Sequence, residues 1–372
     1  MVLEAAEGTP SELSKTHTSI QSGSISRWPN RSDASLRSHS QVLRITCIHL
    51  VLQGNFVCLR LLGIAEFDPY SAAPRPFAAP PFYCSIARDG TYMSSEFRSL
   101  RFQTPDEILL HCLHWHPEPA TETDALPPVI LLHGGGANAH WWDHLGPRLA
   151  FRRDVYALDF RGHGDSAFPD KRFVGAFNTD LEAMLSWLGR EDVYLIGHSL
   201  GASVALDHAS RFADTRGIVL IDLARGGTPG GGRRARLALS LRRTYRTREE
   251  AIERFRFVPE SASPDESIRV HIAEHSVQLE PDGRFGYKFD PRWFSLPSRP
   301  RPNLSRVLCP TLLLRGSNST LLSSEAATSF IQELTSGRLV EIPDAGHHVL
   351  VDQPDRLFIA IQDFVEGSNE ST

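Results

Sequence analysis

The chain has 372 residues, of which 41% are hydrophobic, and a formal net charge of -5 at pH 7. This composition is typical of a globular protein with a large core, and nothing in it favours binding to nucleic acid. A membrane-spanning helix needs about 20 consecutive apolar residues. The most apolar stretch, residues 42–67, is interrupted by Arg44, His49, Gln53, Asn55 and Arg60, so no membrane span is expected.

Cysteine usage indicates the compartment. The chain has five cysteines, an odd number, and none of them forms a Cys-x-x-Cys pair. This pattern argues against a cysteine-based zinc site and against a disulfide framework. A cytoplasmic location is therefore expected, and the residues predict neither a metal nor a cofactor.

Residues 1–92 differ from the rest of the chain. Ten serines fall among the first forty residues, and a segment rich in proline and alanine covers residues 68–82. A targeting peptide fits poorly because Glu4, Glu7, Glu12 and Asp33 make the segment acidic. Two interpretations remain open, a disordered extension or a non-native one with translation starting at Met93. In both, residues 93–372 form one domain.

From Phe97 onward, short strand-like runs alternate with helical stretches, which predicts a mostly parallel sheet covered on both faces. An antiparallel pair is expected first, at residues 100–102 and 108–115. Six further strands are expected at residues 129–132, 155–159, 193–196, 218–222, 311–314 and 339–342. Helices are expected at residues 139–150, 176–188, 200–212, 324–335 and 355–365. Residues 224–305 contain no comparable strand and are interpreted as a helical lid inserted after the sixth strand.

One serine lies at a predicted strand-to-helix corner. The sequence Gly197-His198-Ser199-Leu200-Gly201 follows an apolar run and precedes a helical stretch. Glycines two residues before and after a serine allow a strand and a helix to pack closely around a strained turn. This is the pattern of a nucleophile elbow, which lifts the serine hydroxyl above the sheet.

Three further blocks accompany this elbow at the ends of predicted strands. They are His133-Gly134-Gly135-Gly136, the segment Asp159-Phe160-Arg161-Gly162-His163-Gly164-Asp165-Ser166, and Asp344-Ala345-Gly346-His347-His348. With these four blocks in this order, residues 97–366 resemble the α/β-hydrolase family, in its serine esterase-like branch. The resemblance implies an eight-stranded α/β-hydrolase fold.

The resemblance also implies a role for individual residues. Ser199 would be the nucleophile and His347 its general base, because a serine hydroxyl needs an adjacent base during attack. The amides of Gly135 and Leu200 would form the oxyanion hole. His348 is expected to pack or to face solvent, and His163 and Asp165 are expected to form local hydrogen bonds rather than to act on substrate.

The triad acid departs from the family pattern. Family members most often carry it in a Gly-x-x-Asp loop after the strand equivalent to residues 311–314, but this chain has Gly316-Ser317-Asn318-Ser319-Thr320 there. Asp222 closes the preceding strand at the same edge of the sheet and is the preferred candidate, although it could instead bond the loop that follows. Glu325 is a more remote candidate, since a carboxylate is favoured in a first helical turn in any case.

The expected lid is basic and aromatic. Nine arginines and three glutamates fall between Arg233 and Arg256, which favours either steering of an anionic substrate or a solvated helix face. The aromatic residues could line an acyl pocket or close a core; they are Trp141, Trp142, Phe285, Tyr287, Phe289, Trp293 and Phe294.

The expected function is a cofactor-independent serine hydrolase that cleaves a small or medium carboxylic ester, lactone or thioester through an acyl-serine intermediate. A carbon–carbon bond hydrolase with the same triad remains open, as does a low-turnover ligand-binding or signalling protein. Ser199 argues against haloalkane dehalogenases and epoxide hydrolases, which share the fold but use an aspartate nucleophile. The expected partner is a small-molecule substrate.

Overall fold

The computed structural model describes residues 97–117, 126–224, 226–297 and 300–367 in full, and the backbone of two strands nearer the N-terminus. The chain divides into two units, Met1–Phe82 and Tyr83–Thr372. The boundary expected at Met93 lies outside the described residues. The extension and the alternative start therefore stay predictions.

The first unit contains a β-hairpin that was not expected. Strand β1 (Leu43–Leu52) pairs antiparallel with β2 (Asn55–Ile64), and Leu52 lies opposite Asn55. Both runs are rich in leucine, isoleucine and valine, and β-branched residues favour strands. Two residues, Gln53 and Gly54, stand between the runs, a spacing typical of hairpins.

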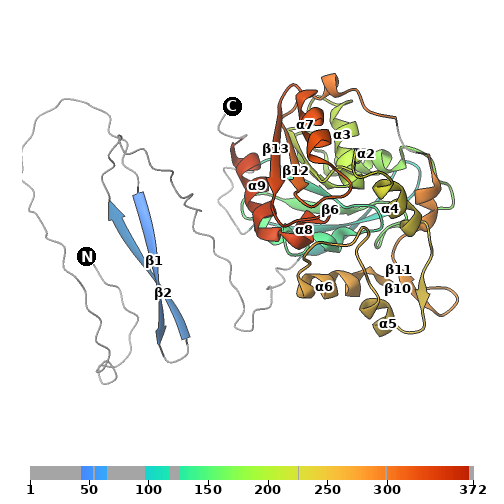
Figure 1. The fold of residues 1–372 in the computed structure, drawn as a ribbon, viewed down its shortest axis with the longest axis horizontal. Helices are drawn as coiled ribbons and strands as arrows, with labels where there is room; N and C mark the ends of the chain where they lie inside the picture. The colour runs from blue at the N-terminus through green and yellow to red at the C-terminus, as the bar shows by residue number, and fades with distance from the viewer. Residues whose placement is uncertain are drawn as a thin grey trace, which may run out of the picture. The chain divides into compact units, whose positions relative to one another are not determined.

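The second unit is built on an eight-stranded sheet (Figure 1). In chain order its strands are β3 (Arg98–Gln103), β4 (Leu109–Trp115), β5 (Val129–Leu132), β6 (Val155–Asp159), β7 (Tyr194–His198), β8 (Gly217–Ile221), β12 (Thr311–Gly316) and β13 (Gly337–Ile342). Their spatial order is β13-β12-β8-β7-β5-β6-β4-β3. All eight expected strands are therefore present, with ends that differ by a few residues.

The sheet is mostly parallel, as expected. Only β4 runs antiparallel to its neighbours, β3 on one side and β6 on the other, which confirms the opening antiparallel pair. The central strand β5 is completely buried, and every residue of its Val-Ile-Leu-Leu sequence is apolar. Such continuous apolar runs are typical of parallel strands covered on both faces.

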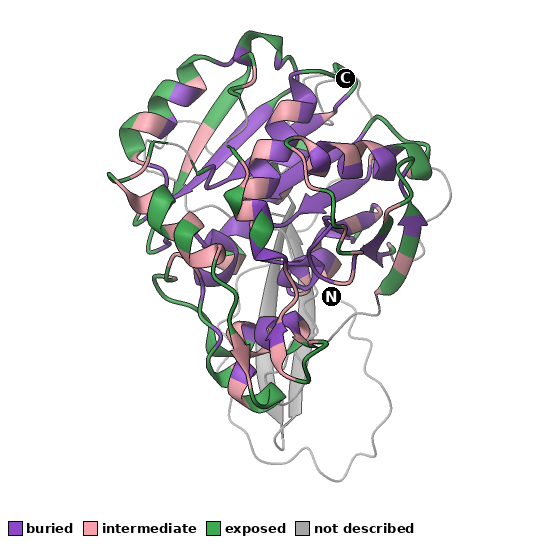
Figure 2. Ribbon diagram, turned by 90° about the vertical axis from the view of Figure 1, so that its right-hand side faces the viewer, coloured by how far each residue is buried: buried purple, intermediate pink, exposed green. Residues whose placement is uncertain are grey.

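Helices cover both faces of the sheet, and each face has its own core cluster. One face carries α1 (Gly146–Leu149), α8 (Val349–Asp352) and α9 (Pro354–Gly367). The other carries α2 (Ala176–Leu188), α3 (Leu200–Ala209) and α7 (Ser324–Gln332). Figure 2 shows the buried strands inside this covering, with the exposed residues on the outer sides of the helices.

The prediction of a single helix at residues 139–150 was wrong. The segment forms a 3-10 turn, η1 (Ala139–Trp142), and then the short α1. Pro147 occupies the first turn of α1, and a proline lacks the N–H that a continuing helix needs and clashes with the preceding turn. The helix therefore restarts at Gly146 rather than running through.

The segment between β8 and β12 is called the insert here, and it is not purely helical as expected. It contains α4 (Gly231–Leu239), β9 (Thr244–Tyr245), α5 (Arg248–Glu253), α6 (Glu266–Ser276), β10 (Val277–Leu279), β11 (Phe285–Tyr287), η2 (Pro291–Ser295) and η3 (Leu304–Arg306). Its three strands form a small antiparallel sheet in the order β10-β11-β9. Figure 1 shows α5, α6, β10 and β11 grouped together below the main sheet.

A turn explains this small sheet. The sequence Pro281-Asp282-Gly283 joins β10 to β11, with Gly283 at φ 81° and the Glu280 amide donating to the Arg284 carbonyl at 2.7 Å. Proline, aspartate and glycine in this order form tight turns because glycine adopts a positive φ without strain.

Among the described residues, no helix is both long and apolar enough to cross a membrane.

Candidate active site

Ser199 stands at a strained corner between β7 and α3. Its φ is 52°, a conformation unusual for a residue with a side chain, and its amide donates to the Ile221 carbonyl at 2.9 Å. A residue with a side chain would not fit at either flanking glycine. A Cβ at Gly197 would lie 2.3 Å from the Gly201 backbone, and one at Gly201 would lie 2.2 Å from the Leu132 oxygen. The glycines thus allow the close packing that holds this half-buried serine at the carboxyl edge of the sheet.

His347 and Asp222 meet at the same edge. His347 Nδ1 donates to Asp222 Oδ1 at 2.7 Å, and the two residues are 4% and 0% exposed. The main chain of His347 is fixed beside the elbow, because its carbonyl accepts a hydrogen bond from His198 Nε2 at 3.0 Å. Residues far apart in sequence are thus held together around Ser199.

Two other histidines border His347. The ring centroids of His198 and His348 lie 4.8 and 5.0 Å from that of His347. Burial lowers the pKa of both neighbours well below the usual range, so both rings stay neutral at pH 7. Of the two outcomes expected for His348, packing or facing solvent, the structure shows packing: the residue is buried, with Nε2 donating to the Pro259 carbonyl at 2.9 Å.

Asp222 is held by three donors. Besides His347, the Gly316 amide donates to Oδ2 at 3.0 Å, and the Ser319 hydroxyl donates to Oδ1 at 2.6 Å. Asp222 itself has φ 45°, and its amide donates to the Leu314 carbonyl at 2.7 Å. The carboxylate is thereby fixed in position although it is completely buried.

Ser319 is a residue that the sequence analysis did not single out. It is the fourth residue of the Gly316-Ser317-Asn318-Ser319 run, the position of the acid in a Gly-x-x-Asp loop. Its hydroxyl also accepts from the amides of Leu321 and Leu322, both at 3.2 Å. The only signal in the sequence was its position, that of the acid in the family pattern. Glu325 lies exposed in the first turn of α7 and does not join this network.

The glycine-rich loop after β5 borders the elbow on its other side. A Cβ built at Gly134 would lie 2.7 Å from His198 Nδ1 and 3.6 Å from Ser199 Cβ. His133 holds the loop because Nδ1 donates to the Gly134 carbonyl at 2.7 Å, while Nε2 accepts from the Phe160 amide at 3.1 Å. Leu200 is the first residue of α3, where a helix leaves its N–H groups without partners in the helix.

The insert reaches this loop directly. A Cβ at Gly135 would lie 2.7 Å from Phe294 Cε1, and one at Gly136 would lie 2.9 Å from Leu239 Cδ2. Phe289 packs edge-on against Phe294 with centroids 5.9 Å apart. An apolar wall therefore faces the half-buried Gly135.

Three other aromatic residues of the expected set pack away from this wall. The Tyr287 hydroxyl donates to the Ala251 carbonyl at 3.0 Å, inside the insert. Trp293 is buried and lies 4.9 Å from Phe177, between centroids. Trp141 packs against Phe257 at 5.3 Å. These contacts separate two groups of aromatic residues that the sequence pattern could not distinguish.

The arginines of the insert bind largely to the insert itself. Arg236 Nε donates to the Phe294 carbonyl at 2.5 Å, and Arg242 donates to the Phe289 carbonyl and pairs with Glu280. Arg248 donates to the Glu274 carbonyl at 2.8 Å. These contacts favour a structural role for these three arginines over steering of an anionic substrate.

The Asp159–Ser166 block is a structural support for the glycine-rich loop. Asp159 accepts from the Ala139 amide at 2.6 Å and from His111 Nδ1 at 2.7 Å. The Asp165 amide donates to Asp159 Oδ2 at 2.9 Å, a local bond, whereas its carboxylate pairs with the distant Lys288 of the insert at 2.7 Å. His163 is fully buried, and burial lowers its pKa to about 3.

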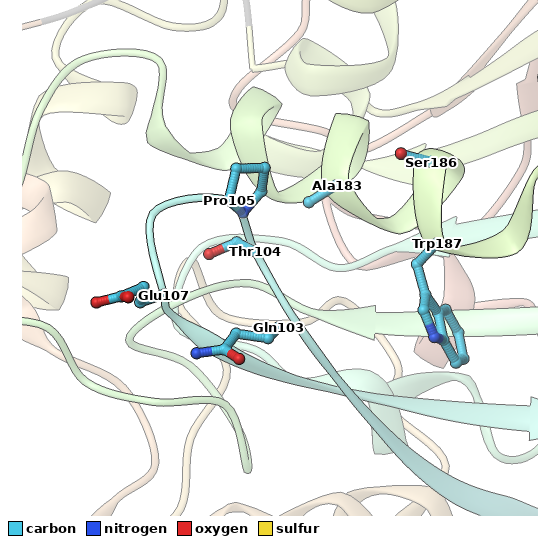
Figure 3. Close-up of a pocket in the computed structure, with 7 residues that line it drawn as sticks. All are labelled: Gln103, Thr104, Pro105, Glu107, Ala183, Ser186 and Trp187. Carbon is cyan, nitrogen blue, oxygen red and sulfur yellow. The ribbon is translucent and has the colours of Figure 1, made fainter.

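A separate hollow of about 420 Å³ lies between the β3–β4 turn and α2 (Figure 3). It is lined by Gln103, Thr104, Pro105, Glu107, Ala183, Ser186 and Trp187. None of the residues around Ser199 lines it, so it is distinct from the candidate active site.

Comparison with known proteins agrees with the fold. Residues 129–360 match the model of the alpha/beta hydrolase family. The sn-1-specific diacylglycerol lipase ABHD11 of Mus musculus is 25% identical over 317 residues, covering 79% of this chain and 94% of that protein. Esterase Rv0045c of Mycobacterium tuberculosis is 29% identical over 245 residues, covering 62% of this chain and 80% of the esterase. An alpha/beta hydrolase structure from Novosphingobium aromaticivorans superposes with a TM-score of 0.62 at 25% identity, covering 73% and 99% of the two chains.

The fold and this match define the class of protein. The chain belongs to the alpha/beta hydrolase family, and it is an enzyme of the hydrolase type.

Proposed function

We propose that the protein is a serine hydrolase that cleaves a small or medium carboxylic ester through an acyl-serine intermediate. The observation that carries this proposal is the 2.7 Å hydrogen bond between His347 Nδ1 and Asp222 Oδ1 beside the Ser199 elbow. An acid in this position fixes the histidine tautomer and stabilises the imidazolium that forms during attack. The esterase and lipase names of two relatives support ester substrates.

The proposed reaction has two halves. Ser199 Oγ attacks the ester carbonyl carbon while His347 Nε2 accepts the hydroxyl proton, and the amides of Gly135 and Leu200 donate to the oxyanion. When the tetrahedral intermediate collapses, the carbon–oxygen bond breaks and His347 returns the proton to the leaving alcohol. His347 then deprotonates a water, which attacks the acyl carbon. The bond between that carbon and Ser199 Oγ breaks, His347 returns the proton to Oγ, and the acid is released. These steps require no cofactor.

In this proposal the insert acts as the lid. Phe294 and Leu239 would contact the acyl group, because they lie against the loop that carries Gly135. The wall is apolar, which favours an uncharged acyl chain over a charged one. Lactones and thioesters remain chemically compatible substrates, since the same groups would act on them.

We also infer a cytoplasmic location. Cys112 and Cys309 are buried free thiols, and burial raises their pKa to about 12 and about 11. Inert thiols of this kind are compatible with a reducing compartment.

A direct test uses the full chain with a fluorophosphonate probe and a short-chain aryl ester. The expected result is covalent labelling and hydrolysis that are both lost in Ser199→Ala. The absence of both in the unmodified chain would favour a low-turnover binding protein. Ser203→Ala, which removes a hydroxyl one turn along α3, is the matched control and should retain labelling.

A further inference from the structure

Four side chains that the proposed reaction does not use converge between η1 and the insert. His140 and Asp143 come from η1 and its C-cap, and His271 and His275 come from α6, where they are one helical turn apart. One potential ligand atom from each lies within 4.8 Å of the other three. Three imidazoles and one carboxylate form a donor set that suits Zn²⁺ and related transition metals.

The contacts within this cluster centre on Asp143. Its Oδ2 atom accepts from His140 Nδ1 at 2.8 Å and from His271 Nε2 at 2.7 Å. The ring of His275 lies 4.2 Å from that of His140 and 4.4 Å from that of His271, between centroids. His275 therefore closes the cluster on the remaining side.

The orientation of His275 matches that of a metal ligand. Its Nδ1 atom donates to the His271 carbonyl at 2.9 Å, which leaves the Nε2 lone pair free for coordination. Ligating histidines usually donate their other ring N–H to a carbonyl or a carboxylate in this way. Asp143 Oδ1 is buried and has no hydrogen-bond partner within the described part of the chain.

Asp143 supplies the one carboxylate of the cluster, and a carboxylate beside three imidazoles suits a divalent transition metal. A metal would take the place of the ring protons that now face Asp143.

The geometric adjustment is small. Tetrahedral Zn²⁺ with bonds near 2.0 to 2.1 Å separates its ligand atoms by about 3.3 Å. The 2.7 and 2.8 Å contacts to Asp143 would lengthen slightly, and the other ligand atoms already lie within 4.8 Å of one another. Rotation of side chains suffices, because Asn138 Nδ2 donates to Ser276 Oγ at 3.0 Å and already fixes η1 beside α6.

We propose that His140, Asp143, His271 and His275 form a binding site for Zn²⁺ or a similar divalent transition metal, which fastens the insert to the body of the enzyme. The site is structural rather than catalytic, since four protein ligands complete a tetrahedral shell. The position of the site would also affect the glycine-rich loop. Because η1 begins shortly after Gly136, the metal would hold the glycine-rich loop and the insert in one arrangement. The proposal does not depend on the serine mechanism.

Two other groupings of possible ligands are weaker candidates. His114, His116 and Asp154 provide only three donors, and the His116 side chain is 63% exposed. In the grouping of His111, Asp159 and Asp165, both oxygens of Asp159 already accept hydrogen bonds, from the Ala139 amide and from His111 and the Asp165 amide. Neither grouping joins the insert to the body of the enzyme.

The test titrates chelator-treated full-length protein, free of any histidine tag, with Co²⁺ and then with Zn²⁺. We expect one equivalent of Co²⁺ to give the strong visible absorption of tetrahedral coordination, and Zn²⁺ to displace it. Zn²⁺ should also raise the thermal midpoint of the protein. His271→Ala and His275→Ala should each weaken binding by at least about tenfold and abolish the rise in thermal midpoint.

Three controls make the result decisive. Circular dichroism establishes that both variants fold, which is expected because their side chains are partly exposed. His116→Ala, which breaks the competing grouping, and His347→Ala, which removes the active-site imidazole, should bind one equivalent as before. If the chain binds no Co²⁺, or if His271→Ala combined with His275→Ala binds it unchanged, the proposed site is wrong.

Discussion

The Ser319 hydroxyl donates to Asp222 Oδ1 at 2.6 Å, and the same oxygen accepts from His347 Nδ1 at 2.7 Å. The serine occupies the loop position that most often carries the triad acid in the family pattern, and Asp222 follows the neighbouring strand β8. Both positions therefore converge on one point beside His347. In the proposed mechanism Asp222 is the acid, and the loop position supplies a hydrogen bond to it instead.

The first prediction concerns Asp222→Asn. The variant should lower kcat by about a thousandfold to ten-thousandfold, because an amide favours the wrong histidine tautomer and cannot stabilise the imidazolium. Asparagine tolerates the positive φ of 45° at this position, so folding should survive. Ester hydrolysis and thermal unfolding measure the two effects separately.

Asp344→Asn is the matched control for this variant. Asp344 also has a positive φ, 59°, and lies in the same loop as His347, but it is exposed. Its substitution should leave kcat within a factor of about two. A loss of less than about threefold in Asp222→Asn would contradict the assignment of Asp222 as the acid.

The second prediction moves the acid back to the loop. Ser319→Asp alone should lower stability and activity, since two carboxylates would share one buried space and the pKa of one of them would rise. Combined with Asp222→Asn, the same change should restore activity by at least about tenfold over Asp222→Asn alone. The control pair, Asp222→Asn with Ser319→Ala, lacks a carboxylate and should show no recovery. Equal activity of the two double variants would contradict the convergence.

The sequence was sufficient for most of the fold. Strands such as β5 are continuous apolar runs, and helices such as α2 carry their apolar residues at helical spacing, so local pattern and tertiary position agree. The failures have local causes. Pro147 interrupts an otherwise helical pattern, and the Pro281-Asp282-Gly283 turn produces strands of only three residues, too short for an alternation to show.

The candidate site could be assembled from the sequence only where a motif marks a residue. The elbow around Ser199 and the Gly346-His347 pair have local signatures, and Asp222 was chosen for its expected place at the sheet edge. Ser319 was missed because a serine in a loop has no signature of its own. The cluster of Asp143 and His271 joins residues 128 positions apart, and no local pattern reports such a contact.

A third prediction concerns Phe294. Its ring lies 2.7 Å from a Cβ built at Gly135, so Phe294→Ala should open space beside the proposed oxyanion hole. The ratio of kcat/KM for long over short acyl esters should rise by about tenfold. Leu279→Ala is the control, because Leu279 lies in the insert but is 65% exposed. If Phe294→Ala and Leu279→Ala both have the same ratio of kcat/KM as the unmodified chain, Phe294 does not contact the acyl group.

The fourth prediction concerns stability at acid pH. Burial lowers the pKa of His144 to about 4, whereas a histidine in an unfolded chain titrates near 6.5. Between these values the unfolded state binds a proton that the folded state does not. The contribution of His144 to the free energy of unfolding is therefore fully present above pH about 6.5 and is lost as the pH falls toward about 4.

Urea unfolding as a function of pH measures this effect. His144→Gln should lessen the fall in the urea midpoint below pH about 6.5, because the amide can still donate to the Leu350 carbonyl but does not titrate. An identical acid slope in His144→Gln and the unmodified chain would show that His144 is not the group responsible.

The last prediction separates a buried ion pair from an exposed one on the same arginine. Arg161 is 1% exposed and donates through Nε to Asp180 Oδ1 at 2.6 Å, while its NH1 atom donates to Asp106 at 2.7 Å. The Asp180 side chain is completely buried, and that of Asp106 is 42% exposed. Asp180→Ala should cost about 3–5 kcal/mol of stability, because it leaves a buried guanidinium without its buried partner.

Asp106→Ala should cost only about 1 kcal/mol, since water can replace an exposed carboxylate. Replacing both buried partners, Arg161→Met with Asp180→Leu, should recover much of the loss because no buried charge is then left unpaired. Urea unfolding of the four proteins gives these differences directly. If Asp180→Ala and Asp106→Ala cost the same, burial does not decide the strength of this pair, and Arg161 is solvated more than the structure indicates.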